Sequence, residues 1–139
     1  MSNAISKDIL KAKKFSPEDI PYLVCIPDGE IKIKGKESQS IVEVKCPFKC
    51  RDKPFESFVN NDAYFCLEQR PDGTLTLKKD HDYHYQVQGM LNMMKVEHCY
   101  FAVWSPQQFH WELVTRDERF WNMEMLPVLQ QFYRYFIVI

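Results

Sequence analysis

The chain has 139 residues, of which 45% are hydrophobic, 14% aromatic and 27% charged, and this composition predicts one globular domain with a single core. The formal net charge of −1 excludes a protein that coats nucleic acid through a general excess of cations. Contact with DNA would need a local basic group, and the candidates are Lys32, Lys34, Lys36, Lys45, Lys49, Arg51 and Lys53. For the first three, a solvated strand edge is the more usual role.

The N-terminal half is expected to be mostly β-structure. We expect a short amphipathic helix or a loose lead-in over residues 5–15, and a single helical turn starting at Ser16-Pro17. Strands are predicted at 22–26, 31–34 and 40–46. We divide the chain into a lead-in over 1–20, whose first four residues are typical of a tag remnant, and one domain over 21–139.

The C-terminal half alternates between helices and strands. A short helix is predicted at 55–59, and strands at 64–69 and 74–77 flank the turn Arg70-Pro71-Asp72-Gly73. Helical periodicity over 80–96 comes from Tyr83, Val87, Met90, Leu91 and Met94. Strands at 99–104 and 109–113 and a helix over 117–135, kinked at Pro127, complete the set. This order predicts an α/β or α+β fold in which helices flank one mixed central sheet.

Two segments carry residues suited to metal-dependent chemistry. In a strand over 40–46, Ile41, Glu43 and Lys45 project to one face, and Val42, Val44 and Cys46 project to the other, which we expect to be core. Asp28 lies in a tight Pro-Asp-Gly turn. If that turn lies beside Glu43, two carboxylates and a strand carbonyl supply the hard oxygens that Mg²⁺ prefers.

Spacing alone does not distinguish these residues from others in the chain. Glu30-Ile31-Lys32 repeats the acid-x-lysine pattern, and Pro71-Asp72-Gly73 repeats the turn. Without further information, a salt bridge on a strand surface is the more common explanation of the pattern.

Five sequence segments, which follow one another along the chain, distinguish between the two copies of each motif. They are Ile41-Val42-Glu43-Val44-Lys45-Cys46-Pro47-Phe48, Tyr64-Phe65-Cys66-Leu67-Glu68, His84-Tyr85-Gln86-Val87-Gln88-Gly89-Met90-Leu91, Cys99-Tyr100-Phe101-Ala102-Val103-Trp104-Ser105-Pro106, and Phe120-Trp121 with Met125-Leu126-Pro127. Together they resemble the YqaJ-type viral recombinase family, in the lambda-exonuclease-like branch of the PD-(D/E)xK nucleases. The resemblance runs from about Pro27 to Tyr135 and selects Glu43 and Lys45, because Cys-Pro-Phe follows Lys45 directly.

The resemblance implies a restriction-endonuclease-like core that hydrolyses DNA with Mg²⁺, for which Mn²⁺ can substitute. It implies metal ligation by Asp28, Glu43 and the Val44 carbonyl, with Lys45 as the catalytic lysine. Gln86 matches a glutamine that holds the active-site water or the lysine, and Tyr83 lies one turn before it. Arg51 matches an arginine that contacts the DNA backbone, and Lys49, Lys53 and Tyr83 are further candidates for contact with DNA.

The chain departs from the family pattern upstream of the turn. Only 26 residues precede Pro27, so the N-terminal helical layer is expected to be shortened. Two expectations follow: weak activity of this chain alone, and a homo-oligomer that hides apolar surface. The alternative function is a binding module that keeps the nuclease fold without cutting DNA.

Histidines and cysteines supply the remaining candidates. His81 and His84 share a helix face, but a capping or surface role is expected, since Mg²⁺ prefers oxygen. The Cys46-x3-Cys50 pair leaves a zinc or thiol-redox protein as a third possibility. Five cysteines at irregular spacing, without a secretory leader, predict an intracellular protein of the cytoplasm or nucleus. No apolar run is long enough to span a membrane.

Overall fold

The computed structural model describes residues 7–11, 13–33 and 39–138. Within these ranges a five-stranded sheet has the order β1-β2-β3-β6-β7. Its strands are β1 (Lys7–Lys11), β2 (Gly29–Ile33), β3 (Gln39–Lys45), β6 (His98–Trp104) and β7 (Phe109–Thr115). The β3–β6 pair is parallel and the other pairs are antiparallel, so the expected mixed sheet is confirmed.

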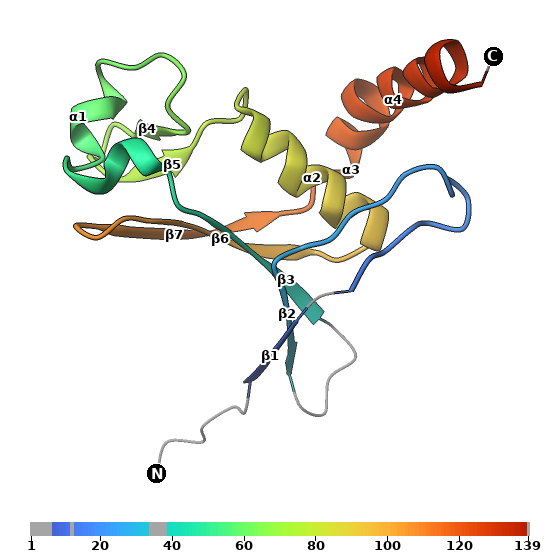
Figure 1. The fold of residues 1–139 in the computed structure, drawn as a ribbon, viewed down its shortest axis with the longest axis horizontal. Coiled ribbons are helices and arrows are strands. Elements are labelled where there is room, and N and C mark those ends of the chain that lie inside the picture. Colours follow the sequence, from blue (N-terminus) through green and yellow to red (C-terminus); the bar gives the residue numbers. More distant parts are fainter. Residues whose placement is uncertain (1–6, 12, 34–38, 139) are drawn as a thin grey trace.

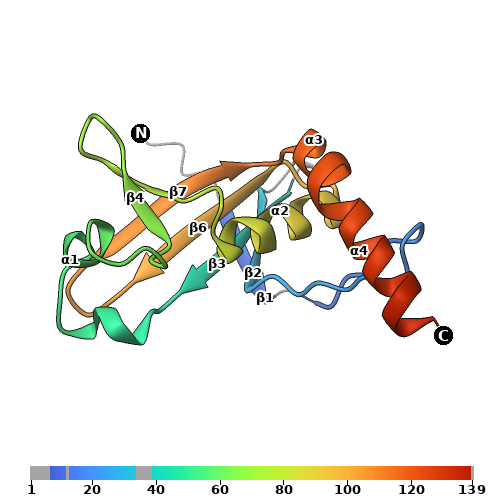
Figure 2. The same ribbon diagram turned by 90° about the horizontal axis from the view of Figure 1, so that it is seen from above.

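The main helix, α2 (Asp82–Met94), crosses the sheet on the same side as the C-terminal helices (Figures 1 and 2). Its apolar side chains Val87, Met90 and Leu91 are buried against Ile41 of β3 and Phe101 of β6. This is the stripe that the helical periodicity predicts. Because the helix is held by this packing, its polar positions on either flank are fixed in place.

A smaller unit packs against the far end of the sheet. It contains η1 (Phe48–Arg51), α1 (Glu56–Val59), β4 (Leu67–Gln69) and β5 (Leu75–Leu77). The two strands form the predicted hairpin, as a separate two-stranded sheet. Its turn needs Gly73, whose φ of +89° lies in the left-handed region.

The C-terminal helix is continuous but changes its winding. It runs through α3 (Glu118–Phe120), the π-helix η2 (Trp121–Met125), α4 (Leu126–Phe132) and the π-helix η3 (Tyr133–Ile137). Pro127 cannot donate a backbone hydrogen bond and its ring crowds the preceding turn, and the π segment just before it supplies the wider turn. The predicted perturbation at Pro127 therefore takes the form of a π segment. Beyond Pro127 the apolar side chains of Val128 and Phe132 are exposed.

The N-terminal part differs from expectation at three places. Residues 7–11 form β1 rather than a helix or loose lead-in, because the free edge of β2 offers them backbone partners. Residues 22–26 make only an isolated bridge between Cys25 and Phe15, and no strand. Ser16 starts no helical turn; its hydroxyl donates instead to the carbonyls of Pro21 and Leu23. Residues 1–4, Lys34 and Lys36 lie outside the described residues.

The expected assignment of faces on β3 was wrong. Ile41 and Glu43 are buried, whereas Val44 and Cys46 are exposed. The reason is that α2 covers the Glu43 side of the sheet, so the acid lies beside the core and the valine face is the open one. None of the helices in the described ranges is both long enough and apolar enough to cross a membrane.

Candidate active site

Asp28 and Glu43 lie together where the turn before β2 meets the middle of β3. The Asp28 backbone N–H donates to Glu43 Oε2 at 3.2 Å, and the Val44 N–H donates to Asp28 Oδ2 at 2.8 Å. Two reciprocal hydrogen bonds therefore fix the turn against the strand. The pairing of Gly29 with Val42 sets this register. The juxtaposition of the two carboxylates that the sequence analysis required is thus present.

Lys45 extends from the same face of β3 and joins Glu43 to α2. Its Nζ donates to Glu43 Oε1 at 3.2 Å and to Gln86 Oε1 at 2.7 Å, and it lies 4.7 Å from the centre of the Tyr83 ring. Gln86 Nε2 lies 3.4 Å from Glu43 Oε1. The lysine is thus held between two oxygen acceptors with an aromatic wall beside it, a position in which its ammonium group has little freedom.

Burial governs the electrostatics of Glu43. Its side chain is only 3% exposed, and this desolvation raises the pKa of the carboxyl above its usual range. The hydrogen bond from Lys45 acts in the opposite direction, and the nearby Asp28 carboxylate adds to the rise. The single positive charge of Lys45 does not balance the two negative charges of Glu43 and Asp28. Such a site favours an additional positive charge.

The donor set fits a hard divalent cation. Two carboxylates from Asp28 and Glu43 and the backbone carbonyls of β3 supply oxygen only, which Mg²⁺ takes with several waters retained. The described residues contain no cluster of three or more His, Cys, Asp or Glu side chains that could hold a metal. The site would therefore hold a cation through few protein ligands, as Mg²⁺ sites commonly do, and would not form a closed structural cage.

The two rival motifs have other roles. Glu30 and Lys32 lie on β2, in register with Ile41 and Gln39 and apart from Lys45. Asp72 caps its own turn, because its Oδ1 accepts hydrogen bonds from the Thr74 N–H at 2.9 Å and from the Thr74 hydroxyl at 2.6 Å. The expectation that a turn explains the second Pro-Asp-Gly agrees with this geometry.

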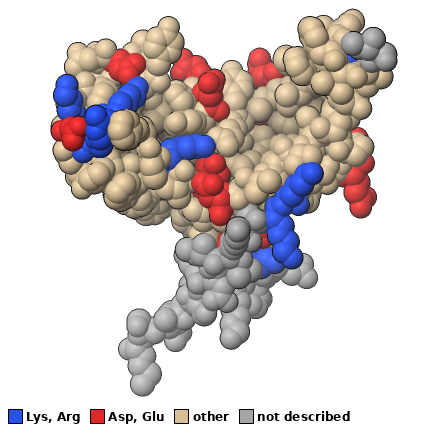
Figure 3. All heavy atoms as spheres, viewed as in Figure 1, with Lys and Arg blue, Asp and Glu red and all other residues tan. Residues whose placement is uncertain are grey.

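The basic residues after β3 form a cluster at one end of the molecule. On the face drawn in Figure 3, lysine and arginine side chains gather over the end that carries α1. Lys49 is paired with Asp62 and lies over the Phe58 and Phe65 rings. Arg51 lies over the Phe48 ring and bonds Asp52 at 3.1 Å, but it is half exposed. Lys49 is thus the most engaged of these residues, while Arg51 and the exposed Lys53 present charge to solvent.

The two histidines of α2 occupy different environments. His81 is the N-cap of the helix, and its Nδ1 accepts the Tyr83 N–H at 3.0 Å, as a capping role predicts. His84 is buried, so the expected capping or surface role was wrong for this residue. Cys46 is exposed and Cys50 is fully buried, and the two thiols of the C-x3-C pair face different surroundings.

The sequence analysis assigned no role to two polar residues, the buried Gln88 and the half-buried Glu112. Gln88 Nε2 donates to the Thr115 carbonyl at 2.9 Å, and its Oε1 accepts the Asp117 N–H at 2.8 Å. Glu112 accepts the Leu77 N–H at 2.6 Å and so ties the small hairpin to the main sheet. Glu112 alternates along its strand as a solvent-facing residue would, so the pattern gave no signal. Gln88 stands two residues after Gln86 on a helix, which places the two on opposite flanks.

Comparison with known proteins gives a structural match only. No protein-family profile and no curated protein sequence matches the chain. Two crystal structures of an alkaline exonuclease from Laribacter hongkongensis are similar to it. One matches at a TM-score of 0.56 and 14% identity, over 95% of this chain and 62% of the exonuclease. The other, a complex with dAMP, matches at 0.53 and 13% identity, over 92% and 62%.

The chain has the fold of a PD-(D/E)xK-type exonuclease. It spans about three fifths of the length of the exonuclease that it matches. The predicted restriction-endonuclease-like core is confirmed at the level of the fold. At 14% identity this similarity concerns the fold alone. The assignment of the site residues rests on the geometry described above.

Proposed function

We propose that this chain is a metal-dependent deoxyribonuclease of the YqaJ-type, lambda-exonuclease-like group, which hydrolyses phosphodiester bonds of DNA from an end. The observation that carries the proposal is the closed set of contacts among Asp28, Glu43, Lys45 and Gln86 on a nuclease fold. A structural salt bridge would need only Glu43 and Lys45. Asp28 also fixes its turn against β3, but neither that contact nor the salt bridge needs the helix glutamine, whose oxygen accepts from Lys45.

Each residue has a chemical role in this proposal. Asp28, Glu43 and the Val44 carbonyl hold Mg²⁺, or Mn²⁺ in its place, which when bound supplies the positive charge that offsets the charge of the phosphate. Lys45 orients the attacking water as a hydrogen-bond donor and would stabilise the negative charge that develops on the phosphate, while Gln86 keeps the ammonium group pointed at the site. Tyr83 closes one wall of this small space. Arg51, Lys53 and Lys49 lie on the segment that continues from β3, where the DNA backbone would pass.

Lys45→Ala is expected to lower the rate of DNA digestion by about 10²–10³-fold, the usual loss when one donor that stabilises the transition-state charge is removed. The assay compares linear and circular DNA with Mg²⁺. The proposal expects linear DNA to be degraded and closed circles to be spared. Lys14→Ala, at an exposed lysine, is the matched control and should cut at the wild-type rate.

A wild-type chain that binds linear DNA but leaves it uncut under these conditions would replace the nuclease proposal with the alternative, a binding module of the same fold. Equal digestion by wild type and Lys45→Ala would remove Lys45 from the chemistry.

Arg51→Ala is expected to weaken DNA binding and to reduce the slope of log affinity against log salt by about 1, because one phosphate contact and its released counterion are lost. The measurement is a titration of labelled duplex DNA at several salt concentrations. Arg119→Ala, at an exposed arginine of α3, is the control and should leave the slope as it is. A wild-type slope in Arg51→Ala would place the DNA elsewhere.

We also propose that the chain is a homo-oligomer that pairs through the open face of the sheet. Trp104, Phe109, Trp111 and Leu113 of β6 and β7 are each about half exposed on that face, and none of them is charged. A neutral apolar face is complementary to a second copy of itself.

Light scattering should show an assembly that Trp111→Lys reduces to monomers. Phe136→Lys on the C-terminal helix should leave it whole; the reverse pattern would move the interface to that helix.

A further inference from the structure

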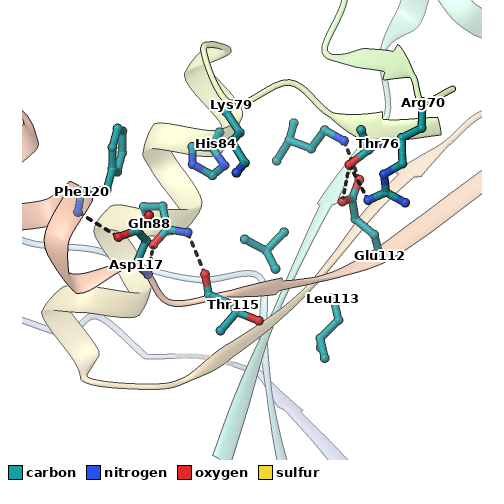
Figure 4. A pocket seen from close by; sticks show the side chains of 12 residues that line it. Arg70, Thr76, Lys79, His84, Gln88, Glu112, Leu113, Thr115, Asp117 and Phe120 are labelled. Atoms are coloured by element: carbon teal, nitrogen blue, oxygen red, sulfur yellow. Dashed lines mark hydrogen bonds between the residues drawn. The ribbon is translucent and has the colours of Figure 1, made fainter. Parts of the chain in front are cut away.

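A second pocket of about 310 Å³ lies on the opposite flank of α2 from the proposed active site (Figure 4). It lies between β5, α2, β7 and the start of α3, and none of Asp28, Glu43, Lys45 and Gln86 lines it. At 3.6 residues per turn, positions 84 and 88 of α2 face this pocket while position 86 faces away from it. A volume of this size is at the lower end of the range for small-ligand sites.

The pocket contains a buried imidazole without a hydrogen-bond partner. His84 is 9% exposed, and among the described residues its ring contacts Phe120 edge-on at 5.5 Å while its nitrogens make no hydrogen bond. Lys79 lies beside it and has no ion pair within the described part of the chain (Figure 4). No side-chain nitrogen or oxygen of the described residues is both fully enclosed and without a partner, so the nitrogens of His84 reach the space of the pocket and can meet a ligand there.

Most of the acceptor oxygens of the pocket already hold hydrogen bonds, although Oδ2 of Asp117 does not, and this leaves cationic donors as the larger unused set. Glu112 accepts from Leu77, Thr76 and His110 through its two oxygens. Gln88 is bonded at both ends of its amide, and Asp117 Oδ1 caps the Phe120 N–H. The groups left over are the donors His84 and Lys79, with the Arg70 guanidinium at the rim. Unused donors next to each other fit an anion.

We propose that this pocket binds a small phosphate ester, with the phosphate held by His84 and Lys79 and the organic part against the Phe120 ring. A phosphate offers several acceptor oxygens to the two donors, and the ring and the neighbouring Leu77 give the pocket an apolar wall. The site is separate from the nuclease centre and does not depend on its activity.

The charges around His84 predict how binding varies with pH. Burial lowers the pKa of His84 and Lys79 lowers it further, while Asp117 and Glu112 act to raise it. A bound phosphate favours the imidazolium form, so it raises this pKa. The same linkage makes the affinity increase as the pH falls through the pKa of His84.

The test uses wild-type protein in EDTA, so that no divalent cation loads the nuclease site. Three probes are titrated by calorimetry and by NMR of the histidine rings: dAMP, inorganic phosphate and deoxyadenosine. We expect dAMP to bind more tightly than phosphate and deoxyadenosine not to bind. We expect dAMP to raise the pKa of His84 and to leave the NMR signals of the His98 ring where they are. This readout needs no variant.

Variants then locate the site. His84→Phe, which keeps an aromatic ring beside Phe120, and Lys79→Met should each weaken dAMP binding about ten- to hundredfold, as the loss of one charge-assisted hydrogen bond requires. Glu43→Gln should bind dAMP as wild type does. The proposal is overturned if dAMP leaves the His84 pKa unchanged, if deoxyadenosine binds as tightly as dAMP, or if Glu43→Gln abolishes binding, which would assign the nucleotide to the nuclease centre.

Discussion

Glu43→Gln and Asp28→Asn are each expected to lower metal-dependent cleavage of DNA by about 10³-fold or more while the fold stays intact. The amides keep the shapes of the side chains but lose the charges that hold the cation, whose charge stabilisation is worth several kcal/mol. The measurement is the digestion rate of linear DNA at matched purity, with circular dichroism to verify the fold. Glu30→Gln, in the second acid-x-lysine copy, is the control and should cut normally.

Glu43→Gln also tests metal binding independently of catalysis, through its free energy of unfolding. Because burial raises the pKa of Glu43, the folded state holds the proton more tightly than the unfolded state. The favourable contribution of Glu43 to the free energy of unfolding is therefore complete at acidic pH, and it is lost as the pH rises through the folded-state pKa of this carboxyl. At neutral pH without metal, Glu43→Gln should thus be more stable than wild type, by about 0.5–2 kcal/mol, the usual gain from relieving an unfavourable functional group.

Added Mg²⁺ should reverse this order. The cation binds only the folded wild type, so the wild-type melting temperature rises with Mg²⁺ concentration while that of Glu43→Gln stays constant. Full cleavage by either amide variant would dismiss the proposed metal ligands. A wild-type melting temperature that is indifferent to both Mg²⁺ and Mn²⁺ would do so without reference to activity.

Gln88→Ala is expected to destabilise the fold by about 2–4 kcal/mol. The substitution removes the partners of the Thr115 carbonyl and the Asp117 N–H in a partly buried setting, and each orphaned group costs about 1–3 kcal/mol. Denaturant unfolding measures the loss. Gln86→Ala, two residues away and exposed, should stay within about 0.5 kcal/mol of wild type, as surface substitutions usually do.

The rate of DNA cleavage should respond to these two substitutions in the opposite order to stability. Gln86→Ala removes the acceptor that lies 2.7 Å from Lys45 Nζ, so cleavage falls although the fold is unchanged. Folded Gln88→Ala, assayed well below its melting temperature, should cut close to the wild-type rate. If Gln86→Ala unfolds the chain, or if Gln88→Ala is as stable as wild type, the division of labour between the two glutamines is wrong.

The strongly patterned parts of the fold could be predicted from the sequence. The apolar run around Phe101, the alternation in 109–113 and the helical period through Val87 and Leu91 all correspond to observed elements. The run around Phe101 and the helical period are set by burial between α2 and the sheet, and local sequence carries that information. The alternation in 109–113 predicts the strand, but its apolar members Phe109, Trp111 and Leu113 lie on the open face. The turn at Gly73 follows for the same reason, since only its own φ matters.

The N-terminal strand could not be predicted, because the cause lies outside the segment. Lys7–Lys11 shows no alternation that favours a strand over a helix, and it becomes β1 through the backbone groups that β2 leaves free at its edge. The faces of β3 were misassigned for a similar reason. Val42 and Val44 are the more apolar residues, but α2 lies on the Glu43 side.

The candidate site was predicted from the resemblance more than from physics. Spacing left Glu30 and Glu43 equivalent, and the blocks after Lys45 and around Gln86 separated them. The structure adds the hydrogen bonds that join these residues. The anion pocket had no counterpart in the sequence, because His84 and Lys79 belong to it only through the positions of Glu112 and Phe120 on distant elements.

The parallel pairing of β3 with β6 also sets when the molecule can become complete during folding. Ile41 pairs with Cys99, so the 57 residues between them must be looped out before the two central strands meet. Contacts across such a separation form late and slowly, since the chain loses loop entropy before it gains burial. Until they form, Glu43 and Lys45 belong to one piece of the chain and Gln86 to another. A partly folded chain therefore lacks an assembled active site. Cleavage of DNA is expected only after β3 has paired with β6.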